Sequence, residues 1–347
     1  MSVKVTVLPS KHEFLVQPDE TILDAALAAG IVLPYSCRDG ACSTCRGKVI
    51  SGTYDAGRSP ARILPPEDIA AGYTLFCQAR PSSDLVIEAH EIRMSSDIQI
   101  RKMPSRVLKL EQLAPDVMVL QLQLPAADPF RYYAGQYLEF ILKDGRRRSY
   151  SIACMPSDDS RVELHIRHLP GGAFTDHVFG LDGNPMKVRE ILRTEGPFGS
   201  FFLRDDSVKP IIFLASGTGF APIKAIIERM DASHNPRPAV LYWGGRRPRD
   251  LYMHDKALQW ARTIPGFSYV PVVSDAAPED NWTGRTGFVH RAVLDDFPDL
   301  SGHQVYACGA PVMVDSARND FVHLNGLPAE EFFADAFTTE ADAVDAA

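Results

Sequence analysis

The pattern of hydrophobic and polar positions in this 347-residue chain predicts where its strands and helices lie. Residues 2–8 alternate between apolar and polar side chains, as a half-buried strand does, and residues 13–16 would be the hairpin partner. Residues 21–30 have the spacing of an amphipathic helix, which Gly30 would end. Further short strands are expected at residues 48–50 and 85–87.

The middle of the chain has a different texture, with many short strand-like runs separated by turn signals such as Asp144-Gly145. These strands are expected at residues 106–113, 117–124, 137–142, 148–152 and 162–166. Short strands broken by turns at this spacing predict a small antiparallel β-barrel.

After residue 208 the strands become continuously apolar and alternate with helical segments. We expect strands at residues 210–215, 239–243, 268–273 and 304–307, and a helix at residues 223–230. Apolar strands alternating with helices predict a doubly wound parallel sheet.

The predicted fold class is therefore a multidomain protein with α+β and α/β parts. The mixed charge, serine and proline of the sequence around residue 100 indicate a linker, and the acidic end of the chain indicates a tail. The predicted borders are an amino-terminal domain at 1–95, a linker at 96–105, a barrel domain at 106–205, a parallel-sheet domain at 206–340 and a tail at 341–347.

Composition narrows the function classes. Apolar residues make up 45% and charged residues 23% of the chain, which are ordinary globular values. A net charge of −8 argues against nucleic acid as a partner. No apolar run reaches the length of a membrane span, and the amino terminus has no secretory pattern, so we expect a cytoplasmic location.

Four cysteines carry the most specific signal. Cys37, Cys42 and Cys45 are followed after a gap by Cys77, which is the C-x₄-C-x₂-C…C spacing typical of plant-type [2Fe–2S] clusters. A zinc site would more often show two paired arms, and disulfides would call for a secretory context. Zinc, disulfides and free thiols are the alternatives to a cluster that moves one electron at a time.

The sequence around these cysteines resembles the plant-type ferredoxins over residues 1–95. Leu33-Pro34-Tyr35-Ser36 leads into the cysteine loop, and small residues such as Gly40 lie within it. The resemblance implies a β-grasp fold in which the four cysteines named above are the metal ligands.

Residues 148–151 read Arg-Ser-Tyr-Ser and resemble the R-x-Y-S signature of the ferredoxin–NADP⁺ reductase superfamily. The resemblance implies that this strand binds a flavin through Arg148, Ser149, Tyr150 and Ser151. Arg148 would pair with the pyrophosphate, Tyr150 would stack on the isoalloxazine ring, and Ser151 would place its hydroxyl near N5 as a catalytic group. Arg146 and Arg147 are interpreted as solvated turn charges.

Residues 165–175 resemble the second flavin segment of that superfamily, where a glycine-rich turn opens a short helix. The implied contacts are Gly172, Phe174 and Thr175, with His165 and Arg167 on the adenylate side. This segment favours FAD over FMN. Residues 195–200 resemble the turn that closes the barrel.

Gly217-Thr218-Gly219 joins an apolar strand to a helix, a corner whose amides attract phosphate. With Pro222 it matches the G-T-G-x-x-P pattern of the same superfamily and departs from the G-x-G-x-x-G dehydrogenase fingerprint. These four residues are the expected nicotinamide-dinucleotide contacts.

Near the carboxyl end, Cys308-Gly309-Ala310-Pro311 resembles the C-G-x-P segment of the superfamily. The resemblance implies that Cys308 is a catalytic residue near nicotinamide C4, with Gly309 and Pro311 beside it. Without these neighbours Cys308 would be interpreted as a small buried strand residue. Residues 331–337 resemble the aromatic carboxyl-terminal strand of the superfamily, which implies that Phe337 covers the flavin face that the nicotinamide reaches.

The choice between NADH and NADPH depends on the residues after the second apolar strand. Asp250 could hold a ribose diol, whereas Arg246, Arg247 and Arg249 could hold a 2′-phosphate. The Asp250-Leu-Tyr pattern resembles NADH-using members, so NADH is favoured and NADPH stays possible.

Three modules in this order resemble reductases that pass electrons from NAD(P)H through FAD and a [2Fe–2S] cluster to a partner metalloenzyme. The cysteine loop and the Phe-Phe-Ala-Asp-Ala-Phe ending resemble the CDP-6-deoxy-glucoseen reductases, which serve an iron–sulfur dehydratase of deoxysugar synthesis. The alternatives are the reductase component of an aromatic-ring or other oxygenase and, more distantly, a non-enzymatic [2Fe–2S] carrier or sensor.

Overall fold

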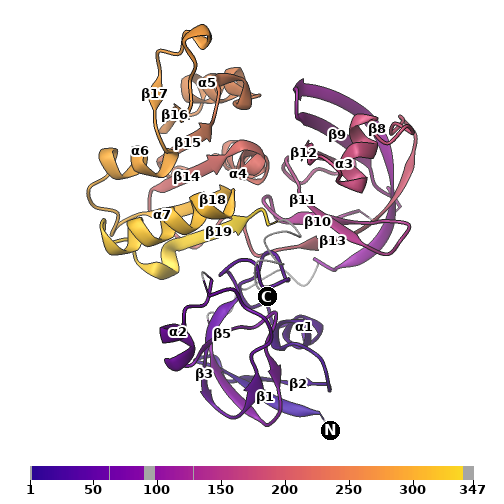
Figure 1. The fold of residues 1–347 in the computed structure, drawn as a ribbon, viewed down its shortest axis with the longest axis vertical. Helices are drawn as coiled ribbons and strands as arrows, with labels where there is room; N and C mark the ends of the chain where they lie inside the picture. Colours follow the sequence, from indigo (N-terminus) through magenta and orange to yellow (C-terminus); the bar gives the residue numbers. More distant parts are fainter. Residues whose placement is uncertain (1, 62, 90–97, 128, 339–347) are drawn as a thin grey trace. The chain divides into compact units, whose positions relative to one another are not determined.

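The computed structural model describes residues 2–61, 63–89, 98–127 and 129–338 (Figure 1). Contacts within the chain define two compact units, one of residues 1–96 together with the segment that starts at residue 335, and one of residues 97–334. The predicted tail at 341–347 and the first residues of the predicted linker lie outside the described residues.

The amino-terminal unit is built on a five-stranded mixed sheet with the order β2-β1-β7-β3-β5. Strand β1 pairs antiparallel with β2 and parallel with β7, which is the β-grasp arrangement that the sequence predicts. Its elements are β1 (Val3–Leu8), β2 (His12–Val16), α1 (Ile22–Ala28), β3 (Arg46–Ser51), β4 (Tyr54–Asp55), α2 (Pro66–Ala70), β5 (Tyr73–Leu75), β6 (Arg80–Pro81) and β7 (Leu85–Glu88).

Helix α1 begins and ends at the residues that its sequence indicates. The Thr21 hydroxyl accepts a hydrogen bond from the Asp24 amide at 3.1 Å, which satisfies one of the free donors of the first turn. Gly30 follows the helix with a φ of 77°, a left-handed conformation that glycine adopts without a steric penalty.

The second unit contains a six-stranded antiparallel barrel with the order β11-β10-β13-β8-β9-β12. A bridge between Ile152 and Leu164 closes it, because it joins the chain after β11 to β12. The antiparallel barrel is confirmed, and β8 begins within the range predicted as linker. Its elements are β8 (Arg101–Ala114), β9 (Val117–Gln123), β10 (Tyr137–Ile141), β11 (Arg147–Ser151), β12 (Arg161–Arg167), α3 (Ala173–Phe179) and β13 (Ile191–Phe198).

Arg147 is not the solvated turn charge that the sequence indicates. Its guanidinium lies 2.5 Å from Glu139 and 2.6 Å from Glu195, two carboxylates that are largely buried. Since β11, β10 and β13 are neighbouring strands in the sheet, this one side chain connects three strands of the barrel.

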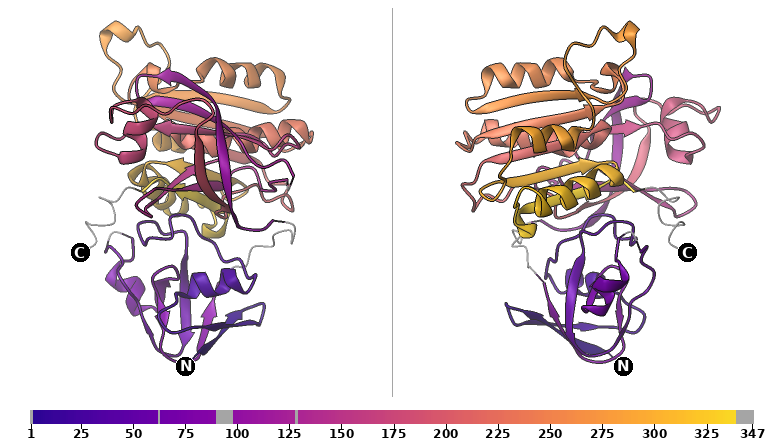
Figure 2. Two further views of the ribbon diagram at one scale, coloured as in Figure 1. Left: turned by 90° about the vertical axis from the view of Figure 1, so that its right-hand side faces the viewer. Right: turned by 60° about the vertical axis from the view of Figure 1, so that its left-hand side comes forward.

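The same unit contains the predicted parallel sheet, with the order β17-β16-β15-β14-β18-β19. Helices α4 and α5 lie on one face and α6 and α7 on the other (Figures 1 and 2). Its elements are β14 (Ile211–Ser216), η1 (Gly217–Gly219), α4 (Phe220–Ala232), β15 (Ala239–Gly245), η2 (Pro248–Asp250), α5 (His254–Thr263), β16 (Phe267–Val273), η3 (Pro278–Asp280), β17 (Arg285–Thr286), α6 (Val289–Asp296), β18 (Gln304–Gly309), α7 (Pro311–His323), η4 (Ala329–Glu331) and β19 (Phe332–Ala336).

The strand order places β14, the first strand of this sheet, at its centre, flanked by β15 and β18. In doubly wound sheets ligands bind at the carboxyl ends of the strands where the order reverses. Both glycine-containing segments predicted to bind the dinucleotide follow or end these central strands. Among the described residues, no helix has the length and apolar character needed to cross a lipid bilayer.

Replacing the arginine that ties the barrel strands is expected to destabilise the barrel. Arg147→Met leaves Glu139 and Glu195 as two largely buried carboxylates without their cation, which should cost on the order of 1–3 kcal/mol. Thermal unfolding is monitored by the fluorescence of the flavin that the unfolding protein would release. Adding Glu139→Gln to the same chain should restore part of the lost stability.

Arg146→Met is the matched control, because Arg146 pairs at 2.7 Å with Asp144 and both side chains are exposed. Exposed pairs contribute about 0–1 kcal/mol, so the control should unfold near the wild-type temperature. Equal shifts for the two variants would contradict a structural role for Arg147.

Candidate redox site

The β-grasp sheet brings the last two cysteines of the motif together. Cys45 directly precedes β3 and Cys77 follows β5, and these strands pair antiparallel with Arg46 opposite Leu75. The two sulfur atoms therefore lie 3.2 Å apart, although the residues are far apart in the sequence.

The four thiols fit a cluster better than they fit disulfides. The Cys45–Cys77 separation exceeds the ~2.05 Å of a disulfide bond, and all the cysteines are free thiols. Cys42 accepts a hydrogen bond from the Cys37 thiol, which lowers the pKa of Cys42 and raises that of Cys37.

A single metal ion is a different case. Within the described ranges, no three histidine, cysteine or acidic side chains converge on one point that could hold an ion. The support for two bridged irons is therefore the set of four cysteines and the closeness of two of them, Cys45 and Cys77, because four thiolates are the donor set of a [2Fe–2S] cluster.

Close packing around the cysteine loop requires glycine. A Cβ atom on Gly47 would lie 2.2 Å from the ring of Phe76, the residue before Cys77. Gly40 has a φ of 84°, which few other residues adopt. The loop can thus fold tightly over the position where the cluster would bind.

The residues predicted to bind the flavin lie on β11 and at the start of α3. Arg148 and Tyr150 share one face of β11, since side chains alternate along a strand, and Ser149 and Ser151 share the other. The Tyr150 ring lies 5.4 Å from that of Phe174 on α3. A guanidinium beside two aromatic rings is a suitable environment for a ring system that carries a pyrophosphate.

Two residues of the second flavin segment, Gly172 and Thr175, stabilise the turn before α3. Gly172 is the residue before α3, and Thr175 lies in its first turn. The Thr175 hydroxyl donates to the Leu169 carbonyl at 2.9 Å, so it fixes the turn from within. Their contacts with a cofactor remain predictions.

His165 and Arg167 face the parallel sheet as well as the barrel. The His165 ring lies 3.0 Å from Glu163 and 2.8 Å from the hydroxyl of Tyr252, which follows η2. Arg167 pairs with Asp116 at 2.8 Å. These contacts leave the predicted adenylate role of both residues without direct support.

The two nucleotide segments predicted from the sequence pack directly against each other. A Cβ atom on Gly219 would lie 2.1 Å from the Cys308 carbonyl oxygen, and one on Gly309 would lie 2.1 Å from the Ser216 hydroxyl. That hydroxyl also accepts the Ala310 amide at 2.9 Å. Only glycine permits this approach, so the turn and the end of β18 form one continuous edge.

The remaining residues of this edge support its shape. The carbonyl of Gly217 accepts the indole N–H of Trp243 at 3.0 Å, and Thr218 is buried beside it. Pro222 lies in the first turn of α4, and Pro311 is the first residue of α7, positions that suit proline. Cys308 is fully buried at the end of β18.

Phe337 directly follows β19 and is half-buried. No described contact connects it to the barrel, so its predicted role as a cover for the flavin stays a prediction.

The loop after β15 holds the residues expected to read the ribose. One oxygen of Asp250 accepts the amides of Arg246 at 2.8 Å and Arg247 at 3.0 Å. The Arg247 guanidinium lies 3.1 Å from Glu279 and 2.6 Å from Asp280 on the neighbouring η3 segment. The hydrogen bonds that Arg247 donates to Asp280 and Glu279 raise its pKa, so it stays charged, and the two carboxylates balance that charge.

Sequence reasoning missed Lys224 and Glu163, which join the barrel to the sheet. The available signal was a lone lysine in the apolar run Phe-Ala-Pro-Ile-Lys-Ala-Ile-Ile of α4. A charge at such a place predicts a buried partner, but the identity of that partner cannot be read from the pattern.

Comparison with known protein families agrees with this division into three parts. Residues 5–82 match the 2Fe-2S iron-sulfur cluster binding domain, residues 104–203 the oxidoreductase FAD-binding domain, and residues 213–319 the oxidoreductase NAD-binding domain. The first match spans all four cysteines of the motif.

Several relatives match almost the whole chain. A CDP-6-deoxy-L-threo-D-glycero-4-hexulose-3-dehydrase reductase of Yersinia pestis is 42% identical, covering 97% of this chain and 99% of the relative. Reductase component 1 of a Comamonas terephthalate 1,2-dioxygenase is 35% identical, covering 98% of each chain.

A solved structure has the same architecture. The Amycolatopsis cytochrome P450 reductase GcoB is 32% identical and superposes with a TM-score of 0.76, covering 97% of this chain and 99% of the other.

The contact between the two nucleotide segments gives a direct test. Gly219→Ala is expected to lower NADH-dependent reduction of the flavin about tenfold or more, because the new methyl group would push the turn away from Cys308. Bound FAD and iron should stay at wild-type levels, as measured by absorbance and iron analysis.

Gly302→Ala is the control, since no atom lies within 4 Å of the added carbon. Unchanged kinetics of the Gly219→Ala enzyme would contradict a dinucleotide site at this edge.

Proposed function

This chain belongs to the family of iron–sulfur flavoprotein reductases, and from that premise we propose that it supplies electrons to an iron–sulfur dehydratase acting on a CDP-linked deoxyhexulose. Members of the family are oxidoreductases that use NAD(P)H, FAD and a [2Fe–2S] cluster to reduce a protein partner. This sets aside the alternatives of a zinc site and of a non-enzymatic carrier or sensor.

The observation that carries the dehydratase proposal is the full-length similarity to the Yersinia pestis hexulose-dehydrase reductase, at 42% identity. The oxygenase reductase component is less similar at 35% identity over the same span, so an oxygenase is the second candidate. The flavin and nucleotide elements common to both relatives do not distinguish them.

The chemistry is divided among groups with different electron capacity. When bound, FAD would supply the acceptor for a hydride from the nicotinamide, and a [2Fe–2S] cluster on the four cysteines would supply single-electron transfer to the partner. We propose that Arg148 and Tyr150 orient the flavin, that Ser151 lies at its reactive atom, and that the glycine edge at residues 217–219 and 308–309 holds the dinucleotide.

We also propose a cytoplasmic location. NADH is an intracellular reductant, and the four thiolates have to stay reduced to hold iron.

Purified partners test the choice of acceptor. The reductase is mixed with a CDP-6-deoxyhexulose 3-dehydrase and, separately, with the oxygenase of a terephthalate system, and NADH oxidation is compared with product formed. Tight coupling with the dehydrase alone is expected. Coupling with the oxygenase but not with the dehydrase would contradict the proposal.

Removing one sulfur ligand is expected to separate flavin chemistry from delivery to the partner. Cys77→Ser should lose the cluster and at least about 100-fold of the dehydrase-coupled rate, while reduction of ferricyanide at the flavin persists. Visible absorbance and iron content report the cluster.

Cys154→Ser is the control, because this thiol lies in the barrel and accepts the Glu163 amide at 3.3 Å, as a hydroxyl also can. A Cys77→Ser enzyme that still drives the dehydrase would show that electrons bypass the cluster.

The pairing of Arg247 with Glu279 and Asp280 predicts a preference for NADH over NADPH. The adenosine ribose lies near the end of the second strand in doubly wound sheets, which here is β15. Glu279→Gln with Asp280→Asn would free Arg247 for a 2′-phosphate. We expect the ratio of kcat/KM for NADPH to that for NADH to rise about tenfold, since a hydrogen bond to a charged group contributes about 1.5 kcal/mol.

Asp295→Asn serves as the control, because it removes a carboxylate from a similar cluster at Arg285, where the separation is 2.9 Å. A ratio that rises equally in the control, or not at all in the double variant, would contradict the role of Glu279 and Asp280.

A further inference from the structure

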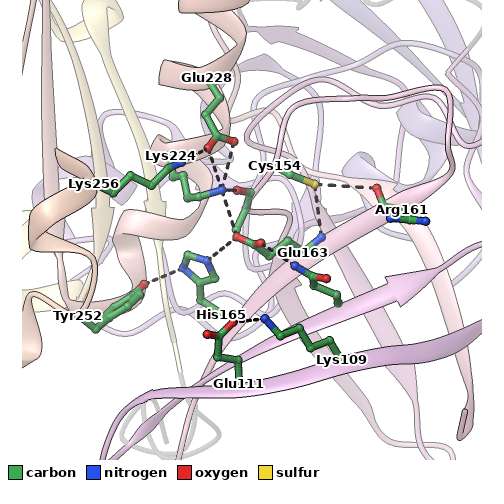
Figure 3. A network of polar contacts seen from close by, with 12 residues as sticks. Lys109, Glu111, Cys154, Arg161, Glu163, His165, Lys224, Glu228, Tyr252 and Lys256 are labelled. Carbon is green, nitrogen blue, oxygen red and sulfur yellow. Dashed lines mark hydrogen bonds and ion pairs between the residues drawn. The ribbon is translucent and has the colours of Figure 1, made fainter. Parts of the chain in front are cut away.

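Lys224 is a buried cation shared by the barrel and the parallel sheet (Figure 3). It lies on α4 and is 5% exposed. Its ammonium donates to the Ala153 carbonyl at 2.7 Å and lies 3.1 Å from Glu163 and 3.0 Å from Glu228. Two of these three partners, Ala153 and Glu163, belong to the barrel side, so the three protons of the ammonium are directed to both halves of the unit.

A second polar link crosses between the same two parts. His165 on β12 lies 2.8 Å from the Tyr252 hydroxyl, and its other ring nitrogen lies 3.0 Å from Glu163. Because the ionised Glu163 carboxylate can only accept, Nε2 of the neutral ring carries the proton donated to it, which leaves Nδ1 to accept from the Tyr252 hydroxyl. Figure 3 shows that Glu163 thereby joins both links into one network.

The charges in this network are fixed by their surroundings. Burial alone would raise the pKa of Glu163, but the His165 hydrogen bond and the Lys224 charge lower it to about 2. Burial opposes the charge of Lys224, but Glu163 and Glu228 raise its pKa overall. Burial lowers the pKa of His165, which stays neutral. The network therefore keeps one arrangement of charges around neutral pH.

The two ends of the network are attached to the two predicted reacting sites. Ala153 follows Ser151 closely in the chain, and its amide donates to the Glu163 carbonyl at 2.7 Å. On the other side, α4 begins directly after Gly219 of the nucleotide turn. Lys224 thus connects the strand end that carries the proposed flavin contact to the helix that starts at the dinucleotide site.

Stability does not explain such an arrangement. Removing two charges from water costs several kcal/mol for each ion, and well-packed apolar residues often give equal or higher stability. What a fully satisfied buried ion pair does fix is geometry, because its hydrogen bonds are lost when the partners shift. Hydride transfer depends strongly on geometry, and a displacement of 1 Å can cost about 10²-fold in rate.

We propose that Lys224 and Glu163 are positioning residues that set the approach of the dinucleotide to the flavin by locking the barrel to α4. This inference rests on the proposed roles of Ser151 and the glycine edge. In this role Lys224 and Glu163 affect the rate of hydride transfer, and the affinities for NADH and FAD stay largely unchanged.

Anaerobic stopped-flow reduction of the full-length holoenzyme by saturating NADH tests this role. The variant Lys224→Met/Glu163→Gln removes both charges, so no carboxylate is left buried without a cation. We expect the rate constant per bound FAD to fall about tenfold or more, while the Kd for NADH changes less than about threefold. A primary isotope effect from NADH deuterated at C4 should persist, which identifies hydride transfer as the slowed step.

Lys109→Met is the matched control, because Lys109 pairs with Glu111 at 2.6 Å on the exposed face of the barrel. The inference is overturned if the double variant reduces its FAD at the wild-type rate, even with lower thermal stability or FAD content, or if the control slows equally. A wild-type enzyme whose flavin NADH does not reduce would instead contradict the proposed function.

Discussion

The buried ammonium of Lys224 is the interaction on which the arrangement of the second unit depends. A lysine can be 5% exposed only when its protons are satisfied, and here a carbonyl and two carboxylates satisfy them. Because Lys224 lies on α4 and two of its three acceptors, Ala153 and Glu163, lie on the barrel, its bonds favour one arrangement of the two parts.

Glycine provides the second requirement, which is close approach. The turn after β14 and the end of β18 meet at distances that no side-chain carbon could occupy, as Gly219 and Gly309 show. The result is an edge of backbone amides at the centre of the sheet, beside the helix that Lys224 holds. Close packing of this edge and a fixed spacing between barrel and sheet are conditions that geometry-sensitive hydride transfer would need.

Much of this architecture could be predicted from the sequence because it is encoded locally. Most strands of the barrel and of the parallel sheet follow from the spacing of apolar residues, and Thr21 and Gly30 mark the ends of α1 through local hydrogen bonds and φ. An exception is β13, whose residues 195–198 resemble a closing turn in sequence but lie in a strand between β10 and β8. The cysteine spacing also indicates the cluster. For the strands and for α1 the residues that determine the feature lie within a short stretch of chain, and for the cluster the first three cysteines do.

What could not be predicted depends on partners from distant segments. Arg147 has the appearance of a turn charge until β10 and β13 place two carboxylates beside it. Asp250 has the appearance of a ribose ligand, but its carboxylate is bonded to amides of its own loop. His165, predicted as an adenylate contact, is hydrogen-bonded to Glu163 and Tyr252. A side chain's type is readable in sequence, but its partner is set by the tertiary fold.

The proposed function requires that electrons which enter as a hydride leave one at a time through the [2Fe–2S] cluster held by the four cysteines. The most direct measurement is an anaerobic titration of the full-length holoenzyme with NADH, in which flavin absorbance and the paramagnetic signal of the reduced cluster are recorded together. The account predicts that both groups become reduced before NADH accumulates. A flavin that is fully reduced beside a cluster that stays oxidised would contradict it.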